Sequence, residues 1–348
     1  MKDNIYLSGM THFHAARHLN LVPEESKSKS LHGHNFKALA RIKVTDERRD
    51  NLESLNERIR KEVDDFNYSF INDHIPEPSD INIANKIAEL LKSPSLVSVS
   101  VCSTDINGAN IELPDRKEVW RSFTFQAAHQ LPKVALDHKC RNMHGHTFRV
   151  VLYSEVQLEN EQVTNLEKVS NELKSILNKK CLNEIKGLEN PTSEVLASWI
   201  WNAISNVNPT ITKVEVMETD HSGCSFNGRS HKIWRQTNLE SAISYNNDEE
   251  IYGYGYKATL YVEAPLDKVK EWVMDFGDVK ELFKPVFQKM DHNNLNEIEG
   301  LEDPSIIDLI KWMSDQLKED FPELNRLDLY ESEGVGAELH IDKGRYDR

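Results

Sequence analysis

The chain has 348 residues, of which 39% are hydrophobic and 28% are charged, a composition typical of folded water-soluble proteins. Its 42 Lys and Arg against 57 Asp and Glu residues give a net charge of −15, which argues against general binding to nucleic acids or membrane surfaces. The N-terminal residues contain no apolar signal core, no apolar run reaches membrane-spanning length, and the four cysteines have no paired spacing. We therefore expect a cytoplasmic protein.

The same pattern occurs three times, over stretches of similar length: residues 1–116, 117–230 and 231–348. The second copy reads FQAAHQL from Phe125 and CRNMHGH from Cys140. The first copy reads FHAARHL from Phe13 and LHGH from Leu31, whereas IYGYGYK from Ile251 replaces the His-Gly-His motif in the third. No long Pro, Gly or Ser linker separates the copies, so we expect three modules that pack together.

Each copy has the same predicted order of elements. In the second copy, Phe123, Phe125 and Ala127 alternate along an opening strand, and another strand follows at 148–153. A helix is predicted over 164–177, a second helix begins at the cap-and-proline pair Asn190-Pro191, and 213–218 forms a closing strand. This order predicts an α+β unit, a four-stranded antiparallel sheet with two helices on one face. Three such sheets could pair their open edges and close into a barrel.

Three histidines of the second copy suggest a metal site. His144 and His146 are two residues apart on a predicted strand and point to the same face, and His129 lies on the preceding strand. Three converging imidazoles are a frequent catalytic Zn²⁺ shell, and the alternative is a set of ordinary strand histidines. Cys140, four residues before His144, is either a fourth ligand or a catalytic thiolate whose pKa a nearby cation would lower.

Two further groups are candidates for chemistry. In the third copy, the carboxylate of Asp291 could orient the imidazole of His292, although a solvated loop pair is the commoner outcome for this dipeptide. Glu218 closes the last strand of the second copy. A carboxylate there could accept paired N–H bonds from a guanidine-like heterocycle edge, although an exposed glutamate is commoner at strand ends.

Four stretches of the second copy resemble the 6-carboxytetrahydropterin synthases of bacterial 7-deazaguanine (queuosine) biosynthesis, within the wider 6-pyruvoyltetrahydropterin synthase family: FTFQAAHQLP, DHKCRNMHGHTFRV, CLNEIKGLENPTSEVLASWIW and VMETDHSGCSFNG. The third copy resembles the later part of the family through VMDFGDVKELFKPVFQKMDHNNLNEIEGLEDPS, and the first is a weaker relative. The resemblance implies the tunnelling (T-) fold, in which three subunits form a twelve-stranded barrel with helices outside. For this chain it implies a pseudo-trimeric ring and a homodimer of such rings.

The resemblance also implies a reaction and a site. The reaction is the Zn²⁺-dependent conversion of 7,8-dihydroneopterin triphosphate to 6-carboxy-5,6,7,8-tetrahydropterin, with release of acetaldehyde and triphosphate. The implied zinc ligands are His129, His144 and His146, the catalytic residues are Cys140, Asp291 and His292, and the substrate-binding residues are Glu218 and Thr192. The alternatives are formation of the 6-pyruvoyl product, other side-chain cleavage, or pterin binding without catalysis.

No copy holds every implied group. The second copy has Asn178-Lys179 at the Asp-His position, and the third has Tyr252 and Tyr254 at two zinc-ligand positions. The first copy has other residues at the positions of His129, Cys140 and Glu218, namely Arg17, Ser28 and Ser103. We therefore hypothesise that a neighbouring module completes the site of the second.

The sequence leaves three points of this hypothesis open. The Asp-His pair could be Asp291-His292 of the third module, which we favour, or Asp73-His74 of the first. The first module could hold a second metal through His32, His34 and either His14 or His18. Lys139, Arg141 or another basic residue could meet the triphosphate, and the pattern does not determine which.

Overall fold

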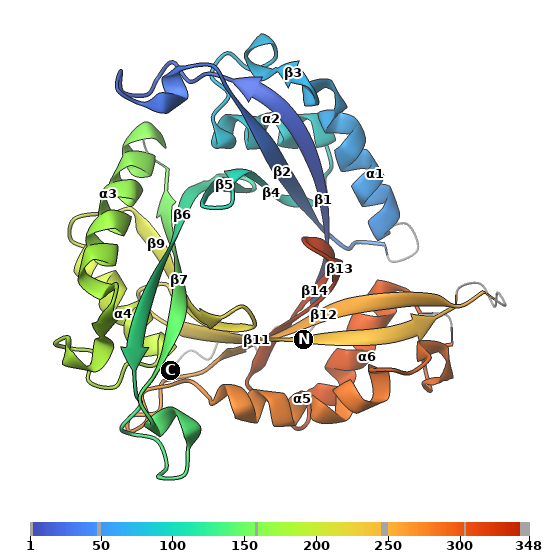
Figure 1. The fold of residues 1–348 in the computed structure, drawn as a ribbon. Coiled ribbons are helices and arrows are strands. Elements are labelled where there is room, and N and C mark those ends of the chain that lie inside the picture. The colour runs from blue at the N-terminus through green and yellow to red at the C-terminus, as the bar shows by residue number, and fades with distance from the viewer. Residues whose placement is uncertain (1–2, 47–49, 157–158, 245–249, 303, 342–348) are drawn as a thin grey trace.

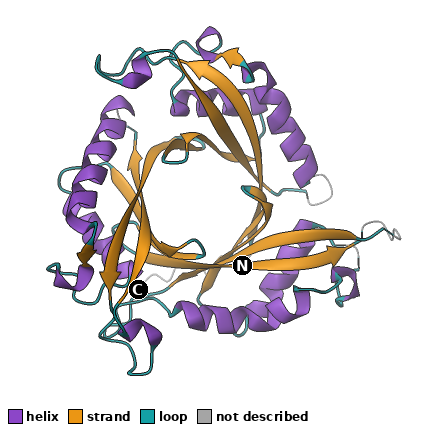
Figure 2. Cartoon of the chain, viewed as in Figure 1, coloured by secondary structure: helices purple, strands orange, loops and turns teal. Residues whose placement is uncertain are grey.

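The computed structural model describes residues 3–46, 50–156, 159–244, 250–302 and 304–341 of the chain. In this part of the chain the strands form a ring and the helices lie around its outside (Figure 1, Figure 2). Twelve antiparallel strands form one sheet that closes on itself, because β14 (Val335–His340) pairs with β1 (Asn4–Arg17). The predicted α+β architecture, a twelve-stranded barrel with outer helices, is confirmed.

Each third of the ring has the predicted order strand–strand–helix–helix–strand–strand. The first module contains β1, β2 (His32–Lys43), α1 (Leu52–Val63), α2 (Asp80–Leu91), β4 (Leu96–Thr104) and β5 (Asn107–Glu112). The second contains β6 (Arg116–His129), β7 (His144–Glu155), α3 (Glu159–Leu177), α4 (Ser193–Ile204), β9 (Ile211–Thr219) and β10 (Ser222–Phe226). The third contains β11 (His231–Ile243), β12 (Tyr252–Glu263), α5 (Phe276–Met290), α6 (Ile306–Leu317), β13 (Leu324–Ser332) and β14. Two short strands, β3 (Ser69–Phe70) and β8 (Lys180–Cys181), pair in parallel with β1 and β6.

The core lies between the sheet and the outer helices. On β6, the alternating residues Phe123, Phe125 and Ala127 are buried, and α3 packs against this strand through residues at helical spacing: Leu166, Val169, Leu173 and Leu177. The buried residues of all three modules form one continuous cluster. No helix among the described residues is long and apolar enough to span a bilayer.

The second helix of the middle module begins later than the sequence suggested. Its N-cap is Thr192, whose hydroxyl accepts a hydrogen bond from the Val195 N–H at 3.2 Å. Pro191 lies outside the helix, so the prediction of Asn190 as cap and Pro191 as first helical residue is wrong. The reason is that a threonine hydroxyl satisfies a free N–H of the first turn, which a proline cannot do.

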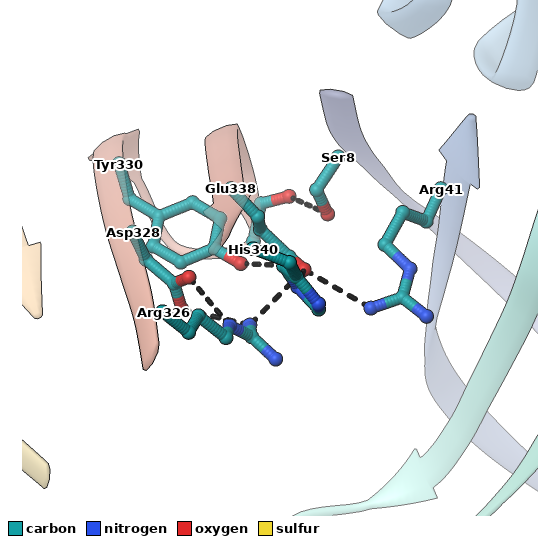
Figure 3. A network of polar contacts seen from close by, with 8 residues as sticks. Ser8, Arg41, Arg326, Asp328, Tyr330, Glu338 and His340 are labelled. Carbon is teal, nitrogen blue, oxygen red and sulfur yellow. Dashed lines mark hydrogen bonds and ion pairs between the residues drawn. The ribbon is translucent and has the colours of Figure 1, made fainter. Parts of the chain in front are cut away.

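A buried charged network joins the third module to the first (Figure 3). Glu338 on β14 accepts a hydrogen bond from Arg41 on β2 at 3.0 Å and lies 3.1 Å from Arg326 on β13. Burial opposes ionisation of Glu338, but Arg326, His340 and Arg41 outweigh it and hold the pKa of the carboxyl well below its usual range. We interpret this junction as structural, because each of its arginines forms an ion pair with a carboxylate of the network.

The opening hairpin of each module extends beyond the strand that precedes it. β6 pairs with β5 only as far as Arg121, whereas its pairing with β7 continues to His129. The equivalent hairpins are β1–β2 and β11–β12, and the three hairpin tips lie at different corners of the ring (Figure 1). Groups carried by two different tips are therefore far apart within one chain.

Candidate active site

The three predicted histidines meet at the tip of the β6–β7 hairpin. His129, the last residue of β6, pairs with His144, the first residue of β7, and His146 follows on the same face. One ring nitrogen from each histidine lies within 4.8 Å of the others. The strand pairing thus brings together the three side chains whose spacing suggested a metal site.

Two carbonyl groups orient these imidazoles. The Nδ1 atom of His129 lies 3.0 Å from the Pro191 carbonyl oxygen, and Nδ1 of His144 lies 2.8 Å from that of Asn142. Because a carbonyl can only accept, Nδ1 carries the proton in both rings and Nε2 is left with its lone pair. Nε2 of His129 is buried and has no protein partner. Carbonyl groups commonly hold metal-ligating histidines in this way.

The electrostatics of the cluster favour the neutral form of two of its imidazoles, those of His129 and His146. Burial lowers the pKa of His129 to about 4, and burial also lowers the pKa of His146. The neighbouring imidazoles add to both shifts. Neutral imidazole is the form that binds a metal ion, so the protonation state, the tautomers and the free Nε2 atom all fit a metal held by three histidines.

Cys140 lies on a short 3₁₀ helix, Lys139–Arg141, beside this cluster. Its carbonyl oxygen accepts a hydrogen bond from the Leu131 N–H at 2.8 Å, which ties the loop to the end of β6. Burial raises the pKa of the thiol, Glu218 and Asp275 raise it further, and only Lys139 opposes them. The protein groups around Cys140 therefore do not lower the pKa of its thiol, and the lowering predicted from a nearby cation would have to come from a bound metal ion.

Glu218 lies on β9, opposite the N-terminus of α4. Its carboxylate accepts a hydrogen bond from the Ser193 hydroxyl at 3.0 Å, and burial raises its pKa to about 7. The adjacent Glu194 also has its pKa raised to about 7 by burial, and it accepts a hydrogen bond from the Val273 N–H at 2.9 Å. A carboxyl that titrates near neutrality can change between an accepting and a donating form at physiological pH.

The third module contributes to this site through residues 267–275, the segment that precedes α5. Thr192 donates a hydrogen bond to the Glu271 carbonyl at 2.9 Å and is 3% exposed, so its hydroxyl has a structural role, and the substrate contact predicted for it stays a prediction. Nε2 of His138 lies 3.1 Å from a carboxylate oxygen of Asp275, and Nδ1 of His138 accepts the Cys140 N–H at 3.2 Å. This chain from Asp275 to Cys140 crosses the module boundary.

Sequence reasoning missed His138 and Asp275. His138 lies in the stretch DHKCRNMHGHTFRV, and Asp275 lies in VMDFGDVK, so both belong to segments that carry the family resemblance. Their pairing depends on how one module's loop lies across another. No spacing along the chain could indicate that contact.

Asp291 and His292 form the predicted oriented pair, but at another corner of the ring. Nδ1 of His292 lies 2.8 Å from an Asp291 carboxylate oxygen, and this contact raises the pKa of His292. Both residues are hydrogen-bonded to Glu240 of β11, near the tip of the β11–β12 hairpin (Figure 1). The structure therefore does not bring the pair to the histidine cluster of the second module. The catalytic role of the pair stays a prediction.

The first module carries different residues at the position of this pair. The Tyr68 N–H donates to the His14 carbonyl, and the Asn67 side chain accepts the His14 N–H at 3.0 Å. Asn178-Lys179 and Asp291-His292 make the same two bonds, and Tyr68, Lys179 and His292 all have positive φ: 56°, 60° and 55°. Asp73-His74 is thus not at the position of the Asp-His pair, and the match made from the sequence in the first module is wrong.

The metal position of the first module is filled by an arginine. Arg17 donates a hydrogen bond to the Pro78 carbonyl at 2.7 Å, as His129 does to Pro191, and forms a buried ion pair with Asp80 at 2.8 Å. Asp80 in turn accepts a hydrogen bond from the Ser103 hydroxyl at 2.8 Å. Ser103 is the counterpart of Glu218, and Asp80 is the counterpart of Ser193. The carboxylate and the hydroxyl of this hydrogen bond have therefore exchanged positions between the two modules. A guanidinium from the chain itself replaces the cation that three histidines could hold.

Comparisons with known proteins identify the family of the chain. The profile of the family described as "PTPS: 6-pyruvoyl tetrahydropterin synthase" matches residues 118–229 and 229–341. A 6-carboxy-5,6,7,8-tetrahydropterin synthase of Synechocystis is 34% identical over 31% of this chain and 91% of its own length. A dihydroneopterin monophosphate aldolase of Pyrococcus furiosus is 31% identical over 28% of this chain and 85% of its own. The solved structure of Caenorhabditis elegans 6-pyruvoyl tetrahydropterin synthase is 19% identical, with a TM-score of 0.30 over 33% of this chain and 96% of that one. Because the profile covers the second and third modules almost entirely, the chain belongs to the 6-pyruvoyl tetrahydropterin synthase family.

Proposed function

We propose that this chain is a zinc-dependent enzyme with one active site per chain, located in the second module. It converts 7,8-dihydroneopterin triphosphate to 6-carboxy-5,6,7,8-tetrahydropterin and releases acetaldehyde and triphosphate. The observation that carries the proposal is the convergence of three imidazoles at one hairpin tip, with the Cys140 thiol on the adjoining loop and the half-buried Glu218 carboxyl on β9. Family membership and the printed names of the relatives support the choice of a pterin substrate.

His129, His144 and His146 are the residues that would hold the zinc ion. When bound, Zn²⁺ supplies a Lewis acid with an open position for a substrate oxygen. The carbonyl groups of Pro191 and Asn142 keep the first two rings in the tautomer that leaves Nε2 free. The protein therefore does not have to reorganise these ligands on binding the metal.

Glu218 anchors the pterin, and Cys140 moves protons on its side chain. In its ionised form the Glu218 carboxylate can accept two N–H bonds from the guanidine-like edge of the ring. Cys140 acts as the base at the side-chain carbons once its proton is lost. The predicted partner of Cys140, His292, lies at another corner of the ring, so its participation requires the second ring of the predicted homodimer.

A test of the proposal compares the same change in two modules. Zinc-loaded protein is incubated with 7,8-dihydroneopterin triphosphate, and products and metal content are measured by mass spectrometry. His146→Ala should lose both zinc and product, because it removes a ligand. His34→Ala, at the equivalent position of the first module, should keep one zinc per chain and full turnover, because Arg17 already fills that site.

The products distinguish the alternatives. Detection of 6-carboxytetrahydropterin together with acetaldehyde supports the proposal. A product from which the side chain has been removed would replace it with aldolase-type cleavage, the activity named for the Pyrococcus relative. Unchanged substrate in the presence of one zinc per chain would contradict an enzymatic role and indicate a pterin-binding protein.

A further inference from the structure

A cavity of about 370 Å³ lies between β11 and α5, at the boundary of the second and third modules. Four of its lining residues can carry positive charge: His221, Arg235, Lys280 and Lys284. Among the described residues, no Asp or Glu lines the cavity. In a chain with a net charge of −15, such a gathering of cationic groups calls for an explanation.

Two of these cations have no ion-pair partner among the residues that the structure describes. The Nε atom of Arg235 is buried without a hydrogen-bond partner, and Arg235 makes no ion pair with any residue that the structure describes. Lys280 is exposed and makes no ion pair within the described chain, whereas Lys284 pairs with Glu281 at 3.0 Å. A buried donor on a charged group costs free energy unless an acceptor reaches it. The arrangement is therefore suited to an anion that comes from outside the chain.

The equivalent place between the first and second modules is neutralised. Arg121 on β6 is the counterpart of Arg235 on β11. Arg121 pairs with Asn107, the first residue of β5, and Arg235 pairs with Ser222, the first residue of β10. Arg121 donates a hydrogen bond to Asn107 at 2.8 Å and pairs with Glu167 of α3 at 3.2 Å.

Asn178 and Asp291 correspond, because each side chain accepts a hydrogen bond from a backbone N–H of the opening strand of its module. Glu167 and Lys280 lie eleven residues before them and therefore also correspond. At the second boundary a lysine thus replaces the glutamate that neutralises this arginine at the first. The exchange turns an internally satisfied ion pair into two unpaired cations.

The cation pair adjoins the candidate active site. Arg235 lies opposite Ser222, whose hydroxyl is 2.8 Å from that of Thr219, the residue after Glu218. At the first boundary, a single cavity of about 260 Å³ is lined both by Arg17, the counterpart of His129, and by Arg121. His129 and Arg235 are the counterparts of these two arginines at the second boundary, where the cavity lined by Arg235 does not include the histidine cluster.

We infer that Arg235 and Lys280 of the third module bind the phosphate chain of the substrate and the triphosphate that the reaction releases. The inference rests on the proposed function for the identity of the substrate, but the anion site itself does not depend on turnover. A guanidinium offers several N–H donors to phosphate oxygens, and the ammonium adds a second charge. The third module would then complete the site of the second by binding the phosphates of the substrate.

The test uses inorganic triphosphate and the full-length chain in isothermal titration calorimetry. Lys280→Glu copies the pairing that Glu167 makes with Arg121, so the folded state has a natural precedent in this chain. It should weaken triphosphate binding by about tenfold or more, because a charged donor is lost and a competing carboxylate is introduced. Lys289→Glu makes the same charge change on the same helix, where Lys289 contacts Gln316, and should leave the dissociation constant within about twofold of the wild type.

Two further measurements separate this inference from the proposed function. Lys280→Glu should raise KM for dihydroneopterin triphosphate and leave the affinity for unphosphorylated neopterin unchanged. Specific triphosphate binding without any turnover would overturn the proposed reaction and keep the anion site. Equal triphosphate affinity in wild type and Lys280→Glu, or equal losses in Lys280→Glu and Lys289→Glu, would overturn the anion site. Tighter binding of inorganic phosphate than of triphosphate would instead assign the site to free phosphate.

Discussion

The boundary between the first and second modules and the boundary between the second and third have the same backbone arrangement. They differ in whether their charged side chains have partners within the protein. At the first, Arg17 pairs with Asp80 and Arg121 pairs with Glu167. At the second, the counterparts of these two arginines are His129, with a free Nε2 atom, and Arg235, with a free Nε atom. Both arginines of the first boundary have a carboxylate partner, although the Nε atom of Arg17 is also buried without one, whereas Arg235 of the second boundary has no carboxylate partner among the described residues. Polar groups that the chain does not satisfy indicate where a ligand belongs.

The difference also explains why a degenerate module remains in the chain. The closed sheet needs three modules, because each junction pairs strands that would otherwise be open edges. The first module keeps this structural task after its site has been filled by an ion pair. The third module keeps it as well and additionally supplies Asp275 and, as we infer, Arg235 and Lys280 to its neighbour.

The largest effect is expected from Cys140→Ser. A hydroxyl is a much weaker acid than a thiol, so loss of the general base should lower kcat by about 10² to 10⁴-fold. Cys181→Ser, on the short strand β8, is the matched control and should retain activity. The measurement is product formation at saturating substrate. Similar kcat values for the two variants would exclude Cys140 as the base.

Breaking the ion pair of the first module should reduce stability without affecting zinc. Arg17→Ala leaves the buried Asp80 carboxylate without its cation, and we expect a loss of about 3–5 kcal/mol in the free energy of unfolding. Adding Asp80→Ala should restore much of this loss. Urea denaturation and metal analysis check both points. A second zinc bound to wild-type protein would refute the view that Arg17 replaces the metal.

The contact across the second boundary can be tested without disturbing either helix cap. Asp275→Asn keeps the oxygen that caps α5 through the Gly277 N–H, and His138→Ser copies Ser26, which caps the equivalent turn of the first module. Each should lower kcat by about tenfold, because Cys140 is held less firmly.

Asp275→Asn should in addition lower the pKa of the Cys140 thiol, since it removes a nearby negative charge. The pH dependence of the rate of alkylation of Cys140 measures that shift, using a protein in which the other cysteines are replaced. A purely structural contact would leave the alkylation profile where it is in the wild type.

The order of elements and the histidine cluster could be predicted because each depends on local periodicity. Alternating apolar residues determine which face of β6 is buried, and the two-residue spacing of His144 and His146 puts both on one face. The prediction of the Asp-His position in the first module was wrong, because Asp73-His74 was chosen by its residue types. The structure assigns the position by hydrogen bonds to the neighbouring strand, where Asn67-Tyr68 stands.

The contacts across boundaries could not be predicted. The joining of Asp275 to His138, and the separation of His292 from the histidine cluster, both follow from the direction in which each hairpin leaves the ring (Figure 1). That direction is set by barrel closure, a property of all twelve strands together. No segment of sequence determines it alone.

The smallest effect is a pH dependence of pterin binding. Burial raises the pKa of Glu218 to about 7, so its protonated form predominates below that pH and its ionised form above it. Only the ionised form can accept two N–H bonds, so affinity should be lost as pH falls through 7, by roughly tenfold between pH 8 and 6 in neopterin titrations followed by fluorescence. Glu218→Gln should bind weakly with no such dependence. Glu194 titrates in the same range, but its carboxylate accepts a hydrogen bond from the Val273 N–H, so Glu194→Gln should keep the pH dependence. A flat profile in Glu194→Gln would show that Glu194, and not Glu218, is the group whose titration controls binding.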